Sequence, residues 1–154
     1  MRNIILLLLA ALAPVQAFAA NQVALDNSVF VERVTTDASG KERALLEEPK
    51  VVVPGDRLVF VLNYRNAGAQ PADQFVITNP MPSAVRFAGT GNAGEIVSVD
   101  GGKTWGTLDT LTMPQADGTR RPAQPADVTH VRWAFQKPIP AGGGGKLMFR
   151  GVVK

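Results

Sequence analysis

The chain has 154 residues and a formal net charge of +3; 45% of its residues are hydrophobic, 19% are charged, none is cysteine and one is histidine. This composition excludes disulfides, a thiolate nucleophile and metal sites built from cysteines or from several histidines. The length allows one domain, or one domain with an extension, and the apolar content is too high for a disordered chain.

Residues 1–19 have the anatomy of a secretory signal peptide. Arg2 supplies a positive charge, residues 4–12 form an unbroken apolar run, and Ala17-Phe18-Ala19 offers the small-x-small pattern for cleavage. The run is only about half the roughly 20 apolar residues that a membrane-spanning helix needs. We therefore expect export to the periplasm or the cell exterior, with no membrane span after cleavage.

Apolar and polar residues alternate with a period of two through most of the remaining chain, which predicts β-strands. The clearest case is 57–66, where Leu58, Phe60 and Leu62 share the face that we predict to be core. The turn signal Pro54-Gly55-Asp56 stands directly before it. Further strands are expected at 28–35, within 43–53, and at 74–78, 85–88, 96–100 and 104–108.

Residues 98–105 match the Ser-x-Asp-x-Gly-x-x-Trp pattern called the Asp-box, which is seen in sialidases and other propellers. In physical terms the pattern predicts a hairpin in which Asp100 accepts hydrogen bonds from turn amides and Trp105 packs back against the sheet. A sialidase needs several such repeats and a full set of blades, whereas this chain has one copy. The pattern therefore indicates a structural turn.

The last part of the chain combines a long irregular segment with two strands. Residues 110–127 contain three prolines and no periodicity, which predicts a long exposed loop. Strands are expected at 129–136, where Val131, Trp133 and Phe135 alternate with polar residues, and at 146–153. Between them, residues 137–145 end in four glycines and predict a hairpin connection.

The residues with reactive side chains do not combine into a catalytic or metal site. His130 has no visible triad partner, and alternation places it on the face opposite Trp133. Glu47 and Glu48 are adjacent, so in a strand they point to opposite faces. The turn aspartates lack the dense ligand loop that calcium requires. We expect a protein that is not an enzyme and that carries no cofactor or metal.

Basic residues are spread over several segments. Lys103, Arg120, Arg121 and Lys137 are candidates for a local patch. Nucleic-acid binding would call for aromatic residues interleaved with them, and there are none. We therefore expect no nucleic-acid partner.

Several strand-and-turn motifs occur together in an order typical of one bacterial module. They are Pro54-Gly55-Asp56, the strand 58–64, Asn66-Ala67-Gly68, the segment 75–82, Val131-Arg132-Trp133 and Pro140-Ala141-Gly142. On these motifs residues 51–153 resemble the bacterial conserved-repeat domain of unknown function eleven. The resemblance implies an immunoglobulin-like sandwich used in envelope and extracellular proteins. Asn79 stands where that family often has aspartate, and the chain holds one copy where the family often has tandem repeats.

The predicted organisation is a signal peptide at 1–19, an arm with the first strands at 20–50, and the immunoglobulin-like domain at 51–154. Short strands separated by turns, with no helical crossovers, predict an all-β antiparallel immunoglobulin-like sandwich of seven to nine strands.

Three functions stay open on the sequence alone. The leading hypothesis is a non-enzymatic interaction or structural module of the bacterial envelope or surface that binds a protein partner. Self-association by strand addition through residues 21–34 is one form of it. The second is a glycan or small-ligand module, with Lys103, Trp105, Arg120 and Arg121 as contact residues. The third is an enzyme using Asp100 or His130, which no arrangement of residues supports.

Overall fold

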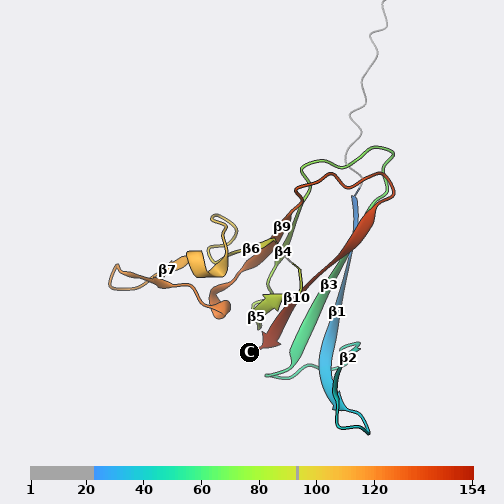
Figure 1. Cartoon of the computed structure of the whole chain (residues 1–154). Coiled ribbons are helices and arrows are strands. Elements are labelled where there is room, and N and C mark those ends of the chain that lie inside the picture. Colours follow the sequence, from blue (N-terminus) through green and yellow to red (C-terminus); the bar gives the residue numbers. More distant parts are fainter. Residues whose placement is uncertain (1–22, 93) are drawn as a thin grey trace, which may run out of the picture.

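The computed structural model describes residues 23–92 and 94–154, so the predicted signal peptide at 1–19 lies outside the described residues. Within these ranges the fold is all-β, with antiparallel strands in a sandwich-like arrangement (Figure 1), which confirms the predicted class. The two ranges contain ten strands, against the seven to nine expected. No helix in the described ranges is long and apolar enough to cross a membrane.

The strands form two sheets and a separate hairpin. The larger sheet contains β1 (Val23–Thr36), β2 (Glu42–Glu47), β3 (Arg57–Asn66), β5 (Val85–Thr90) and β10 (Gly144–Val153), in the order β2-β1-β3-β10-β5. The smaller sheet contains β4 (Val76–Pro80), β6 (Glu95–Ser98) and β9 (His130–Ala134), in the order β4-β9-β6. The hairpin consists of β7 (Thr112–Pro114) and β8 (Arg120–Pro122) and projects to one side (Figure 1).

The core lies between the smaller sheet and the β3–β10 part of the larger one. Phe60 of β3 is opposite Val29 on β1 and Phe149 on β10. The rings of Phe60 and Phe149 stack with centroids 4.4 Å apart, and the ring of Trp133 lies 6.2 Å from that of Phe149. Phe149 and Val131 of β9 are both 0% exposed. Every second side chain of β3, β9 and β10 thus points into the core, as the alternation of apolar residues predicted.

Most predicted strands are found near their expected positions. The strand predicted at 57–66 is β3 with the same bounds. β2 lies within the interval predicted for a second early strand apart from its first residue, Glu42. β1 begins at Val23 rather than at residue 28, because Val23–Val31 pair with β3 along its whole length.

The strand predicted at 104–108 is wrong. The turn after β6 returns to the smaller sheet through a single bridge, between Gly106 and Val97. The chain then enters a 3-10 turn at Leu108–Thr110, where the Thr110 amide donates to the carbonyl of Thr107. The turn therefore ends the pairing after one residue.

The long loop predicted at 110–127 is wrong in its central part. β7 and β8 pair there as an antiparallel hairpin, and a 3-10 turn follows at Pro125–Asp127. The hairpin is closed by Asp117 and Gly118, because Gly118 adopts a φ of 84° that favours glycine and the Thr119 amide donates to Asp117. The prolines stand at the ends of the short strands rather than preventing them.

The predicted hairpin between the last two strands is also wrong, because β9 and β10 belong to different sheets. The connection crosses between the sheets and is held by a bridge of Ile139 to Ala72, both buried. Gly144 and Gly145 belong to β10 instead of a flexible turn. A Cβ at Gly145 would lie 2.6 Å from the Tyr64 hydroxyl, so glycine lets β10 approach β3 here.

Candidate functional site

The Asp100 turn is a fully bonded structural unit. Its carboxylate accepts hydrogen bonds from the Ser98 hydroxyl (2.8 Å), the Thr104 amide (2.9 Å) and the Thr104 hydroxyl (2.7 Å). The bonds from Thr104, followed by that from Ser98, hold the pKa of Asp100 far below its ordinary value. The predicted bonding of Asp100 to turn amides is therefore confirmed, and every oxygen that the carboxylate offers is already occupied by its own turn.

Trp105 folds from this turn onto the outer face of the smaller sheet, as predicted. Its indole N–H donates to the carbonyl of Gly102 (2.9 Å), and its ring is half-buried. The guanidinium of Arg132 on β9 lies 3.5 Å from the centroid of the ring, and the ring of His130 meets it edge-on at 6.2 Å. The Trp105 ring thus packs against side chains of β9, and Arg132 covers one of its faces.

Arg132 is held by contacts that leave its charge uncompensated within the described ranges. Its Nε donates to the Thr78 hydroxyl on β4 (3.0 Å), while its guanidinium covers Trp105. No carboxylate in those ranges forms an ion pair with it. Cation–π stacking accounts for its position without a ligand.

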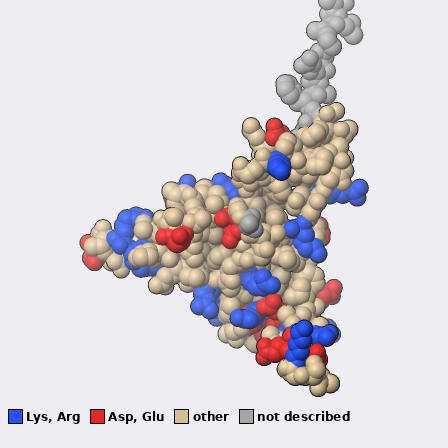
Figure 2. Space-filling view, viewed as in Figure 1, with Lys and Arg blue, Asp and Glu red and all other residues tan. Residues whose placement is uncertain are grey.

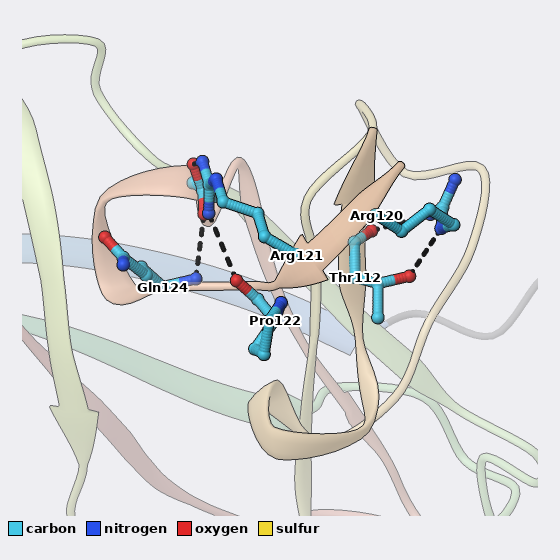
Figure 3. A network of polar contacts seen from close by, with 6 residues as sticks. Thr112, Arg120, Arg121, Pro122 and Gln124 are labelled. Atoms are coloured by element: carbon cyan, nitrogen blue, oxygen red, sulfur yellow. Dashed lines mark hydrogen bonds and ion pairs between the residues drawn. The ribbon is translucent and has the colours of Figure 1, made fainter. Parts of the chain in front are cut away.

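A cleft of about 580 Å³ lies between the Asp100 turn and the β7–β8 hairpin. Lys103 and Arg120 both line it, together with Thr112, Met113 and other residues of the two segments. Arg120 is fixed there by two bonds to Thr112, one to its hydroxyl and one to its carbonyl, each 2.7 Å (Figure 3). Figure 2 shows basic side chains on this projection, with acidic ones beside them. Asp100 lines the same cleft, so the cleft offers two basic side chains and one carboxylate.

Arg121 points to the other side of β8 and does not reach the cleft (Figure 3). Its guanidinium forms two bonds with the Asp127 carboxylate, at 2.7 and 2.8 Å. These bonds and the amide of Gln124 lower the pKa of Asp127. Arg121 therefore ties the hairpin to the 3-10 turn behind it. Of the four predicted contact residues, the cleft brings together Lys103 and Arg120, and it includes neither Trp105 nor Arg121.

Within the described residues, His130 forms no hydrogen bond or ion pair with a carboxylate. His130 is half-buried, with its Nδ1 3.0 Å from the Thr129 hydroxyl. Across 23–92 and 94–154, no group of three or more histidine, aspartate or glutamate side chains is placed to hold a metal ion.

The first half of β1 presents a second candidate surface, which is built from backbone and apolar side chains. β3 pairs with Val23–Val31, and β2 pairs only with Val31–Thr36 on the other side. In the described part of the chain, the outer edge of residues 23–30 therefore pairs with nothing. Leu25 and Val29 lie on the core side of the sheet, yet they are 51% and 37% exposed.

Sequence reasoning named residues 21–34 for strand addition but did not identify these two side chains. The alternation of Leu25, Val29 and Val31 was a signal for an apolar face. It could not show that the smaller sheet stops short of that face.

Comparisons with protein-family models, with curated proteins and with solved structures found no match for this chain.

Proposed function

We propose that the mature chain is an exported, non-enzymatic interaction module of the bacterial envelope, with an immunoglobulin-like sandwich that joins a protein partner by strand addition at β1. The observation that carries the proposal is the unpaired outer edge of residues 23–30, beside the exposed Leu25 and Val29. In strand addition the backbone bonds supply affinity, and pockets for alternate side chains supply specificity. β1 offers an unpaired backbone edge and exposed apolar side chains along the same stretch.

The sequence of residues 23–30 also lacks most of the residue types by which proteins prevent such pairing. Edge strands are usually protected by lysine, proline, bulges or a covering segment. Residues 23–30 contain no lysine, proline or glycine, and Asp26 is their one charged residue. β2, at the outer side of the same sheet, carries three charged residues, Glu42, Arg43 and Glu47. The contrast supports a pairing role for β1 in particular.

Strand addition is tested with the mature chain as bait for envelope proteins. Changing Leu25→Lys and Val29→Lys together places two charges on the exposed face and is expected to abolish capture of a specific partner. Val76→Lys, an equally exposed valine on the smaller sheet, is the matched control and retains capture. Equal capture by both variants would show that β1 is not the binding surface.

Export is tested by fractionating cells that express the full chain. The mature form, beginning after Ala19, is expected outside the cytoplasm. Replacing Ala17 and Ala19 with bulky residues removes the small-x-small pattern and is expected to leave the chain unprocessed. A full-length chain that stays in the cytoplasm without these changes contradicts export.

The cleft favours a second function, the binding of an anionic glycan or small anion. Lys103 and Arg120 line it together, and Arg120 is held in place by Thr112. Titration with sulfated or carboxylated sugars, followed by calorimetry, tests this. Arg120→Ala is expected to remove binding, whereas Lys137→Ala is the control because Lys137 is an exposed basic residue outside the cleft. Binding lost in neither variant, or in both, contradicts a site in this cleft.

A further inference from the structure

The direction of the backbone groups along β1 follows from the bonds at the other side of β3. The Asn66 amide donates to the Gly143 carbonyl, and the Val153 amide donates to the Asp56 carbonyl. Even-numbered residues of β3 therefore direct their N–H and C=O groups toward β10, and odd-numbered ones direct theirs toward β1. In the register of the two strands, the odd-numbered residues of β3 are opposite even-numbered residues of β1, whose N–H and C=O groups therefore point toward β3. The groups that point outward belong to Val23, Leu25, Asn27 and Val29.

The outward groups are limited to a short window. Val31 also points outward by the same alternation, but it is opposite Glu47 of β2. A strand added along 23–30 must end where β2 begins. The free edge therefore fits a partner strand of about the same short length. The same residues of a second copy of this chain form such a strand.

We propose that the strand added to β1 is β1 of a second copy of this chain, related by a two-fold axis at Asn27, so that Leu25 of each copy lies opposite Val29 of the other. The inference rests on the proposed strand addition and names its partner. The two larger sheets then join edge to edge, with their core faces on the same side. An isologous contact of this kind uses the same patch on both copies and closes after two.

Charge and register together select Asn27 as the centre. Outward-pointing residues must face one another, so odd positions pair with odd ones. An axis at Asp26 would set two carboxylates directly opposite each other, which is unfavourable. An axis at Ser28 would place Leu25 against Val31, whose edge pairs with β2, and would leave only residues 26–30 to pair, whereas an axis at Asn27 leaves residues 24–30. An axis at Asn27 pairs Asp26 with Ser28, and it covers the two exposed apolar side chains with each other.

The first experiment measures the association of the purified mature chain by sedimentation over a range of concentrations. The wild type is expected to form dimers reversibly. Asn27→Pro removes an outward N–H but no donor to β3, so it is expected to weaken dimerisation about tenfold or more at unchanged thermal stability. Val76→Lys is the control and is expected to dimerise as the wild type does. A wild type that stays monomeric at all concentrations overturns the proposal.

The second experiment tests the axis and uses the absence of native cysteine. With the axis at Asn27, residue 26 faces residue 28 of the other copy at a Cα separation of about 4.5 Å, which a disulfide can bridge. Oxidising a mixture of Asp26→Cys and Ser28→Cys chains is expected to give a linked dimer. Each variant alone is expected to give none, because its own copies lie about 8 Å apart.

The outcomes separate this inference from the proposed function. Cross-linking of Asp26→Cys alone, or of Ser28→Cys alone, places the axis elsewhere and overturns the pairing stated here. A monomeric chain whose capture of a different envelope protein is lost in Asn27→Pro overturns self-pairing but leaves strand addition in place. A monomer whose capture is unaffected by Asn27→Pro overturns both.

Discussion

β1 and β10 flank β3 on opposite sides, and they differ in how well the smaller sheet covers them. Phe60 lies between Val29 of β1 and Phe149 of β10 in the same register row. Phe149 is 0% exposed, whereas Val29 is 37% exposed although it points to the same side. Alternation fixes which face a side chain takes, but the position of the second sheet decides whether that face is buried.

The cover over β10 comes from aromatic and aliphatic side chains of β9 and β4. Trp133 packs at 6.2 Å from Phe149, and Ile77 and Val131 complete the layer. β1 has the same kind of apolar residues on that side, but its first half lies beyond this layer. The difference is therefore one of coverage rather than of composition, and substitutions can measure it.

The largest expected effect comes from truncating one residue on each side of Phe60. Phe149→Ala removes a buried ring and is expected to cost about 3–5 kcal/mol of unfolding free energy. Val29→Ala is expected to cost less than about 1 kcal/mol, since the valine is exposed in the single chain. Urea denaturation at low protein concentration measures both. Similar losses of unfolding free energy in the two variants would show that the smaller sheet covers β1 as well as β10.

A second effect concerns the crowding of β10 on its β5 side. A Cβ at Gly151 would overlap the Val85 side chain and lie 3.2 Å from the Arg86 carbonyl. Gly151→Ala is expected to cost about 1–3 kcal/mol by overpacking. Gly91→Ala is the matched control, because its nearest neighbour would be Met148 at 3.7 Å. Equal stability of the two variants in thermal unfolding contradicts close packing of β5 on β10.

A smaller effect is expected at the outer face of the smaller sheet. Arg132→Ala removes the guanidinium from the Trp105 ring and is expected to cost about 0.5–1 kcal/mol. Iodide should then quench the fluorescence of Trp105 more strongly, while buried Trp133 stays protected. Arg121→Ala is the control, since Arg121 binds Asp127. Unchanged quenching in Arg132→Ala would contradict the stacked geometry.

The last expected effect is that of Asp100→Asn, which destabilises the fold at neutral pH and differs less from the wild type in acid. The pKa of Asp100 lies below its ordinary value of 3.8 because of the bonds from Thr104 and Ser98. The charged form therefore stabilises the fold above that ordinary value, and this contribution is lost as the pH falls toward the folded-state pKa. Asp100→Asn should unfold with a shallower dependence on pH below about 4. Unfolding midpoints measured between neutral and acid pH check this; parallel curves contradict it.

The fold was predictable where alternation alone determines a strand. β3 has the predicted bounds, and β9 and β10 lie close to theirs, because apolar residues recur at nearly every second position along each of them. The start of β1 was missed because Asn27 interrupts the apolar positions before Val29; pairing with β3 makes residues 23–27 a strand. The assignment of β9 and β10 to different sheets depends on Ile139 meeting Ala72, a contact between distant parts of the sequence.

The candidate cleft was half predictable for a related reason. Lys103 was singled out beside the Asp100 turn, but Arg120 joins it only because β7 and β8 form a hairpin. The Asp117-Gly118 pair was a usable hairpin signal in a segment treated as a loop. Once β8 is a strand, Arg120 and Arg121 must point to opposite faces, so they could not serve one site.

The course of β1 and β10 along β3 has a mechanical consequence. Val23 lies beside Asn66 at one end of β3, and Val152 lies beside Arg57 at the other end. Tension applied between the two ends of the described chain therefore runs along the strands, and inter-strand bonds are perpendicular to them. Each of the two junctions, with nine register pairs apiece, is loaded in shear and all at once. The β1–β2 hairpin lies outside this load path, so the resistance to such tension comes from the β1–β3 and β3–β10 junctions.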